Sequence, residues 1–289
     1  MRRRTGRSAA GQVLPGFCHS PLQPVVARAA LHEWEEPCIS GSRGSGAVFF
    51  TGCNLRCCFC QNTTISMGGT GVPITAARLR DIYGELIEKG AHNINLVTPT
   101  PYKKAILESL AEPLPVPVPV VYNCGGYETT ATIDAFKGKV QIYLPDLKYL
   151  DPALAKRYSA AEDYPQVAAE AILHMYDQVG PYELDDDGLL KKGVVIRHLI
   201  LPGCLDNTKA VIDWVRDHFA DGQVLFSLMR QYVPCGRAAD YPEINRRLTD
   251  EEYDEAEQYL FDSGIEDGFV QEKDSASEAF IPAFDGTGV

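Results

Sequence analysis

Short apolar runs alternate along most of the chain with segments in which apolar residues recur every three or four positions. The runs end at glycine, proline or polar residues, which is typical of buried strands. Six runs predict strands, at residues 46–52, 93–98, 120–122, 140–144, 193–201 and 224–228. The sequence therefore predicts a sheet whose strands are separated by helical connections.

The segments between the runs have the spacing of helices with one apolar face. They predict helices at residues 75–89, 102–111, 129–136, 151–179 with a break near Pro165, 207–219 and 249–261. Thr75 is the expected N-cap of the first helix, and Asn207 or Thr208 that of the fifth. Leu248–Glu251 has the pattern of a capping box for the last. Residues 113–119 carry proline at every second position and predict an extended connector.

Strands that alternate with helices pair in parallel through crossover connections, so the fold class is an α/β sheet or barrel. A closed barrel of this kind has eight strand–helix repeats, and six predict a partial (β/α)6 barrel over residues 33–270. Residues 1–32 contain no acidic side chain and begin with an arginine cluster. We expect them to form a basic, flexible N-terminal extension, with an organelle transit peptide as the alternative. Residues 25–34 are apolar and mixed, and they predict a short element that packs on the main domain. Residues 271–289 are polar and predict a loose C-terminal tail.

Composition narrows the class of partner. The 289 residues are 45% apolar and 23% charged, and 27 basic against 39 acidic side chains give a net charge of -12. This balance disfavours nucleic acid, because binding to phosphates needs clustered lysine and arginine. No apolar segment approaches the roughly 18 residues that cross a bilayer, so we expect no membrane insertion and a cytoplasmic location.

Four of the nine cysteines fall within residues 53–60. Adjacent Cys57 and Cys58 are poor disulfide partners for each other, which favours a reducing compartment. Cys53, Cys57 and Cys60 have the spacing C-x3-C-x2-C, directly after a predicted strand. A structural zinc site usually has four ligands in two separated pairs, whereas three thiolates match a [4Fe-4S] cluster with one iron open. A zinc knuckle or incidental thiols remain the alternative reading.

Polar residues follow the other predicted strands. The carboxyl ends of parallel strands meet at one rim, so these side chains are expected to lie together. They are Thr98, Asn123, Asp146, Lys148, Arg197 and Gln231. For Asp146 and Lys148 a structural ion pair and a cofactor contact both remain open. Arg197 within an apolar strand needs an anion, which we expect a bound ligand to supply.

The cysteine motif, with Phe59 before its last cysteine, resembles the loop of radical S-adenosylmethionine (SAM) enzymes. The surrounding residues 44–57 resemble the pyruvate formate-lyase activating enzymes within that superfamily. Further matches lie at residues 96–100, 121–128, 142–148 and 195–203, so the resemblance covers about residues 30 to 235.

This resemblance implies a partial barrel of the radical SAM type that binds a [4Fe-4S] cluster and SAM. One-electron reduction would cleave SAM to a 5'-deoxyadenosyl radical, which in the activating enzymes takes hydrogen from a glycine of a glycyl-radical enzyme. An electron donor such as flavodoxin or ferredoxin is implied as well. A small molecule or a peptide as the target is the first alternative. A non-catalytic iron–sulfur or zinc module is the second.

The resemblance also implies roles for single residues. Cluster ligation falls on Cys53, Cys57 and Cys60, and adenine contact on Phe59. Arg197 would pair with the carboxylate of SAM, a task suited to its planar guanidinium. Asp146 and Lys148 would approach SAM from the fourth strand, and Asn123 its ribose. Thr98 opens the sequence Thr-Pro-Thr where family members usually carry Gly-Gly-Glu, and Cys18 and Cys38 stand where the closest-looking subgroup has extra cysteines.

Overall fold

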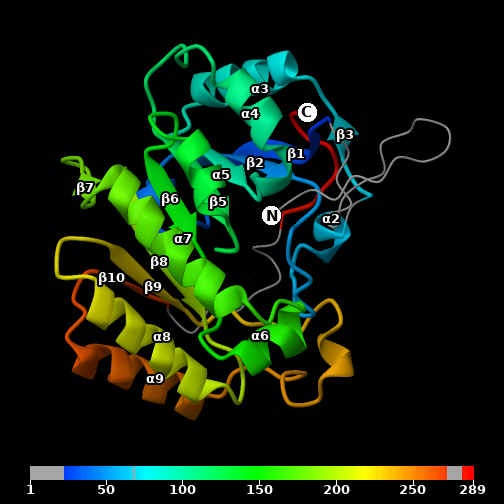
Figure 1. Ribbon diagram of the computed structural model, residues 1–289. Helices are drawn as coiled ribbons and strands as arrows, with labels where there is room; N and C mark the ends of the chain where they lie inside the picture. Colours follow the sequence, from blue (N-terminus) through cyan, green and yellow to red (C-terminus); the bar gives the residue numbers. More distant parts are fainter. Residues whose placement is uncertain (1–22, 68, 272–281) are drawn as a thin grey trace.

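The computed structural model describes residues 23–67, 69–271 and 282–289. Its strands form one curved sheet in the order β10-β9-β8-β6-β5-β4-β2-β1-β3, with β7 paired to β8 at the side. The two ends of this order are not paired with each other within the described ranges. The sheet is therefore an open, partial barrel, and the predicted fold class is confirmed (Figure 1).

The six predicted strands form most of the parallel part of the sheet, to which β10 is added beside β9. They are β2 (Ser45–Phe50), β4 (Ile94–Val97), β5 (Val120–Cys124), β6 (Ile142–Pro145), β8 (Leu190–Leu199) and β9 (Leu225–Met229). Each is parallel to its neighbour within this group. Consecutive parallel pairing brings their carboxyl ends to one rim, as the sequence predicts.

Four further strands were not predicted. They are β1 (Val25–His32), β3 (Val72–Pro73), β7 (Glu183–Leu184) and β10 (Gly268–Val270). Except for β1 they have two or three residues each, too few for a pattern of alternation to appear.

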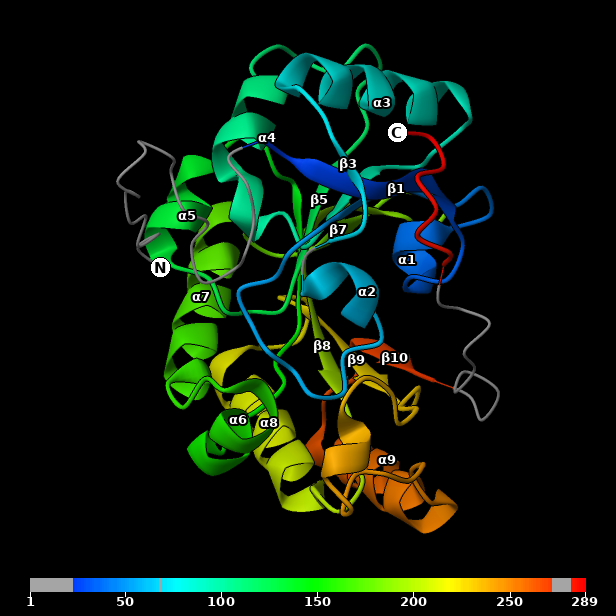
Figure 2. The same cartoon turned by 90° about the vertical axis from the view of Figure 1, so that its right-hand side faces the viewer.

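Helices surround the outer face of the sheet (Figures 1 and 2). Their bounds are α3 (Ala76–Glu88), α4 (Lys103–Ser109), α5 (Thr130–Ala135), α6 (Pro152–Ser159), α7 (Tyr164–Val179), α8 (Leu205–His218) and α9 (Asp250–Ser263). Two short helices, α1 (Pro37–Ser40) and α2 (Thr63–Ser66), precede them. Inside the barrel, Cys38 and Ile39 of α1 pack against apolar residues of β5, β6, β8 and β9, so α1 fills the interior from one end.

The capping predictions hold at two helices and fail at one. Thr75 caps α3, and Thr249 forms a capping box with Glu252 at α9. The helix α8, however, begins at Leu205, which places Asn207 and Thr208 inside its first turn. Both side chains are buried and bond to other elements: Asn207 Oδ1 accepts from the backbone of Leu150, 2.9 Å away. Tertiary hydrogen bonds thus override the capping preference of these residues.

The expected flexible extension over residues 1–32 is wrong for its last part, where the short packed element expected at residues 25–34 is present. Val25–His32 form β1, which pairs antiparallel with the whole of β2. Val26, Ala27 and Ala29 of this strand are almost completely buried, so burial of apolar surface holds the segment in the sheet. Residues 1–22, including Cys18 and the arginine cluster, lie outside the described residues.

The expected loose tail is wrong for residues 282–289, which lie beside β1 (Figure 2). The amide of Gly286 donates to the carbonyl of Ala27 at 3.0 Å, and the amide of Ala29 donates to the carbonyl of Thr287 at 2.8 Å. Gly288 lies so close that a Cβ atom there would be 2.0 Å from the Ala29 carbonyl oxygen. Backbone pairing, which side-chain polarity does not reveal, fixes this segment.

Candidate functional site

The predicted cysteine loop follows β2 and opens onto a cavity at the rim of the barrel. The cavity has a volume of about 260 Å³, and Cys53, Cys57 and Cys60 all line it. Cys58 is not among the lining residues; it is 2% exposed and packs in the apolar core. Side-chain direction thus separates the three motif cysteines from their neighbour.

Neighbouring segments hold the loop by backbone hydrogen bonds. The amide of Cys58 donates to the carbonyl of Tyr158 at 2.7 Å, and the carbonyl of Cys58 accepts from the amide of Arg237 at 2.6 Å. Phe59 lines the cavity and packs on Tyr232, with ring centroids 5.9 Å apart. The loop is therefore fixed between the end of α6 and the segment that follows β9.

The electrostatics of Cys53 and Cys57 suit a positively charged ligand. Burial, followed by the nearby Cys57, raises the pKa of Cys53 to about 12. Burial also raises the pKa of Cys57, although Lys148 opposes this shift. Buried thiols of this kind lose their protons when a metal binds, because the metal supplies the missing positive charge.

The arrangement of possible donors bears on which metal centre the cavity can hold. Within the described ranges, no group of three His, Cys, Asp or Glu side chains is close enough together to bind one ion. The cysteines of an iron–sulfur cube each bind a different iron and stand farther apart than ligands of one ion. Three thiols on the wall of one cavity therefore fit the donor set of a [4Fe-4S] cluster.

The polar residues predicted at the rim meet in this same cavity. Its lining includes Thr98, Asn123, Asp146, Lys148, Arg197 and Gln231, together with the three thiols and Phe59. The structure thus brings together every residue for which the sequence predicts a role in binding cluster or cofactor. Whether each one contacts a cofactor stays a prediction.

A network of buried charges forms the base of the cavity. Arg197 donates from Nε to Asp146 Oδ1 at 2.9 Å, from Nη1 to Glu35 Oε2 at 3.0 Å and from Nη2 to Asn123 Oδ1 at 2.7 Å. Lys148 Nζ donates to the other oxygen of Asp146 at 2.6 Å. The chain itself therefore supplies two carboxylates for Arg197, and an additional ligand carboxylate on this guanidinium stays a prediction.

The charges in this network shift one another's pKa values. Burial acts to raise the pKa of Asp146, but Arg197 and Lys148 overcome it, so the pKa lies below its usual value. Burial acts to lower the pKa of Arg197, and Asp146 leads the carboxylates that raise it. Asp146 is thus ionised at neutral pH and holds both cations in place.

Sequence reasoning missed Glu35. It lies between β1 and α1, in a stretch without a clear pattern, and its side chain is 9% exposed. Its Oε1 accepts from Asn95 at 3.2 Å and from Asn123 at 3.1 Å. The sequence indicated this site only by two consecutive glutamates, Glu35 and Glu36, after an apolar run. Such a pattern does not show whether the two side chains are buried or exposed.

The turn after β4 has an unusual backbone. Thr98 has a φ of 59°, in the left-handed region that a β-branched residue rarely adopts. Its amide donates to the carbonyl of Asn123 at 2.8 Å, and the hydroxyl of Thr100 donates to Glu128. Glu128 is 3% exposed, and burial raises its pKa to about 7. A buried carboxyl thus supports the turn that carries Thr98.

Glu128 is expected to make stability depend on pH. Its folded pKa of about 7 exceeds the unfolded value of 4.5, so the folded state is favoured most below pH 4.5 and loses stability as pH rises through 7. Glu128→Gln keeps an acceptor for Thr100 and cannot ionise. The free energy of unfolding of this variant relative to the native chain should rise by up to about 3 kcal/mol between pH 4.5 and 8.

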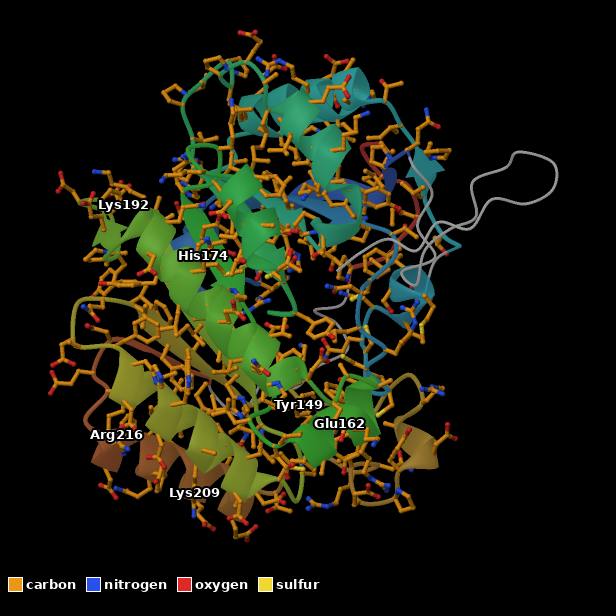
Figure 3. All side chains as sticks on the ribbon, in the orientation of Figure 1. Tyr149, Glu162, His174, Lys192, Lys209 and Arg216 are labelled. Carbon is orange, nitrogen blue, oxygen red and sulfur yellow. The ribbon has the colours of Figure 1, made fainter. Side chains whose placement is uncertain are left out.

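Urea unfolding at several pH values measures this difference. Glu162→Gln, at an exposed glutamate (Figure 3), is the control and should show no such pH dependence. A constant difference between Glu128→Gln and the native chain across this pH range would contradict the expected titration.

The chain is similar to known proteins in both sequence and structure. No protein-family model matches the chain. The uncharacterized protein MJ0674 of Methanocaldococcus jannaschii is 31% identical over 251 residues, which are 83% of this chain and 68% of that protein.

Two crystal structures of SuiB from Streptococcus suis share the fold with a TM-score of 0.53 and 14% identity. One is bound to the precursor peptide SuiA, and its match covers 76% of this chain and 46% of SuiB. The other is bound to S-adenosylmethionine, with 78% and 52% covered. The chain thus spans about half the length of SuiB.

Proposed function

The chain belongs to the same family as MJ0674, and we propose that this family member is a radical SAM enzyme that holds a [4Fe-4S] cluster on Cys53, Cys57 and Cys60. The observation that carries the proposal is the meeting of these three thiols with the polar rim residues in one cavity. The fold shared with SuiB, which has been crystallised with S-adenosylmethionine, supports it.

A reduced cluster with an open iron would supply the electron that cleaves SAM to a 5'-deoxyadenosyl radical. The chain's own residues would bind and orient the cofactor beside that iron. Phe59 offers an aromatic face for the adenine, and Asn123 an amide for the ribose. Arg197, held by Asp146 and Glu35, would face the carboxylate of SAM. The burial of these groups would exclude water from the radical.

For the target of the radical we propose a glycine of a glycyl-radical enzyme, with flavodoxin or ferredoxin as electron donor. The resemblance of residues 44–57 to the activating enzymes supports this choice. Modification of a peptide is the second candidate, because a structure of the same fold has been crystallised with its precursor peptide.

Anaerobic reconstitution with iron and sulfide tests the chemistry. The expected result is a cluster with four irons per chain that, with dithionite and SAM, releases 5'-deoxyadenosine measurable by liquid chromatography. A protein that takes up only zinc, or a cluster that never cleaves SAM, would favour the non-catalytic module. Appearance of a glycyl-radical signal in electron paramagnetic resonance (EPR), when a glycyl-radical enzyme encoded nearby is added, distinguishes the first target from the second.

A further inference from the structure

Three successive residues of the cysteine loop, 56–58, form hydrogen bonds with the last two residues of α6. The amide of Arg56 donates to the carbonyl of Ser159 at 3.3 Å, and the amide of Cys58 donates to that of Tyr158 at 2.7 Å. Between them, Ser159 Oγ donates to Cys57 Sγ at 3.0 Å. The last turn of a helix has backbone carbonyls without intrahelical partners, and the loop amides donate to two of them. These bonds hold the loop where the Ser159 hydroxyl reaches the Cys57 thiol.

The hydroxyl of Tyr149 fixes the direction in which the hydroxyl of Ser159 donates its proton. Tyr149 Oη lies 2.9 Å from Ser159 Oγ, and both residues are buried (Figure 3 labels Tyr149 near α6). A serine hydroxyl has a single proton. If Ser159 gives that proton to Cys57, it must accept from Tyr149, so the three groups form a chain of donors that ends at the sulfur.

We propose that Ser159 is a positioning residue that raises the reduction potential of the cluster through its hydrogen bond to Cys57. This inference rests on the proposed function. Reduction adds one electron, and therefore negative charge, to the cluster and its thiolates. A donor to a ligand sulfur stabilises the more negative state more strongly, which makes the cluster easier to reduce.

Tyr149 strengthens the effect in two ways. It keeps the lone pair of Ser159 occupied, so that the serine proton stays directed at the sulfur. It also polarises the serine hydroxyl, because hydrogen bonds in a chain reinforce one another in a buried environment. Loss of the tyrosine hydroxyl should therefore shift the potential in the same direction as loss of the serine hydroxyl, by less.

An anaerobic redox titration of the reconstituted protein without SAM tests the inference. The titrant, dithionite, supplies the electron, and the EPR signal of the reduced cluster reports its fraction. We expect Ser159→Ala to lower the reduction equilibrium constant about tenfold, which is 59 mV for one electron. Ser159→Thr retains the hydroxyl and should stay near the native potential, while Tyr149→Phe should give a smaller decrease.

The chain offers a matched control in a second buried pair. Ser109 and Tyr83 are joined by a 3.1 Å hydrogen bond between α4 and α3, and neither residue lines the cavity. Ser109→Ala removes the same group at equal burial and should leave the potential unchanged. A native potential in both Ser159→Ala and Tyr149→Phe, or an equal shift in Ser109→Ala, would overturn the inference. Failure of the native protein to bind a cluster would instead overturn the proposed function.

Discussion

Cys57→Ala is expected to abolish SAM cleavage and to leave the protein without a stable [4Fe-4S] cluster. Cys57 is the middle cysteine of the motif, and its thiol lines the cavity beside those of Cys53 and Cys60. Loss of a supporting partner of a metal ligand already costs about 10- to 100-fold in affinity or activity. Removal of the ligand itself should therefore reduce the rate of 5'-deoxyadenosine release by more than about 100-fold. Iron and sulfide analysis of the reconstituted variant measures the cluster directly.

The adjacent cysteine provides the control for this experiment. Cys58→Ala removes the same atom one position along the chain, from a side chain in the apolar core instead of the cavity. This variant should lose some thermal stability, since a small cavity forms in the core. It should still bind the cluster and cleave SAM. The ligand assignment is wrong if Cys57→Ala retains cleavage, or if Cys58→Ala loses the cluster while it remains folded.

The sequence was sufficient for the six predicted parallel strands because most of their residues are buried on both faces. A strand such as β6 reads as a continuous apolar run, and its four residues are all buried. The position of the site followed from the same pattern. Since parallel strands end at one rim, Asp146 after β6 and Arg197 in β8 could be expected together without knowledge of their contacts.

The ion pair of Lys148 with Asp146, two residues apart, was one of the readings open from the sequence, and the structure contains it. The other contacts within the site could not be predicted, because they join residues far apart in the sequence. Glu35 lies 162 positions before Arg197, and Ser159 lies 102 positions after Cys57. No local periodicity links such pairs. The prediction of a loose C-terminal tail was wrong at residues 282–289 for a related reason. The backbone makes their pairing with β1, and the pattern of side chains does not reveal backbone pairing.

Arg197 is the central residue among the buried charges that line the cavity. It bonds carboxylates from two separate segments, Glu35 before α1 and Asp146 after β6. Such a cation stabilises the folded state chiefly by preventing the cost of unpaired buried charge, which exceeds the gain from the pair itself. Removal of the Arg197 side chain should therefore lower the free energy of unfolding by much more than the ion pairs contribute to it.

Arg197→Ala is accordingly expected to lower the free energy of unfolding by about 3–5 kcal/mol at pH 8, measured by urea denaturation. Burial already raises the pKa of Glu35, and Arg197 opposes that rise, so the pKa of Glu35 should climb further in the variant. Protonation then relieves the unpaired charge as pH falls, and the loss of stability should be smaller at pH 5 than at pH 8.

Two further variants show whether unpaired buried charge causes the loss of stability in Arg197→Ala. Glu35→Gln added to Arg197→Ala should recover part of the lost stability, since it removes one of the unpaired carboxylates. Arg216→Ala, at an arginine paired with aspartates on the surface (Figure 3), should leave stability unchanged. A loss that is equal at both pH values and is not reduced by Glu35→Gln would point to lost packing instead. Unchanged SAM affinity in folded Arg197→Ala would contradict its proposed role at the SAM carboxylate.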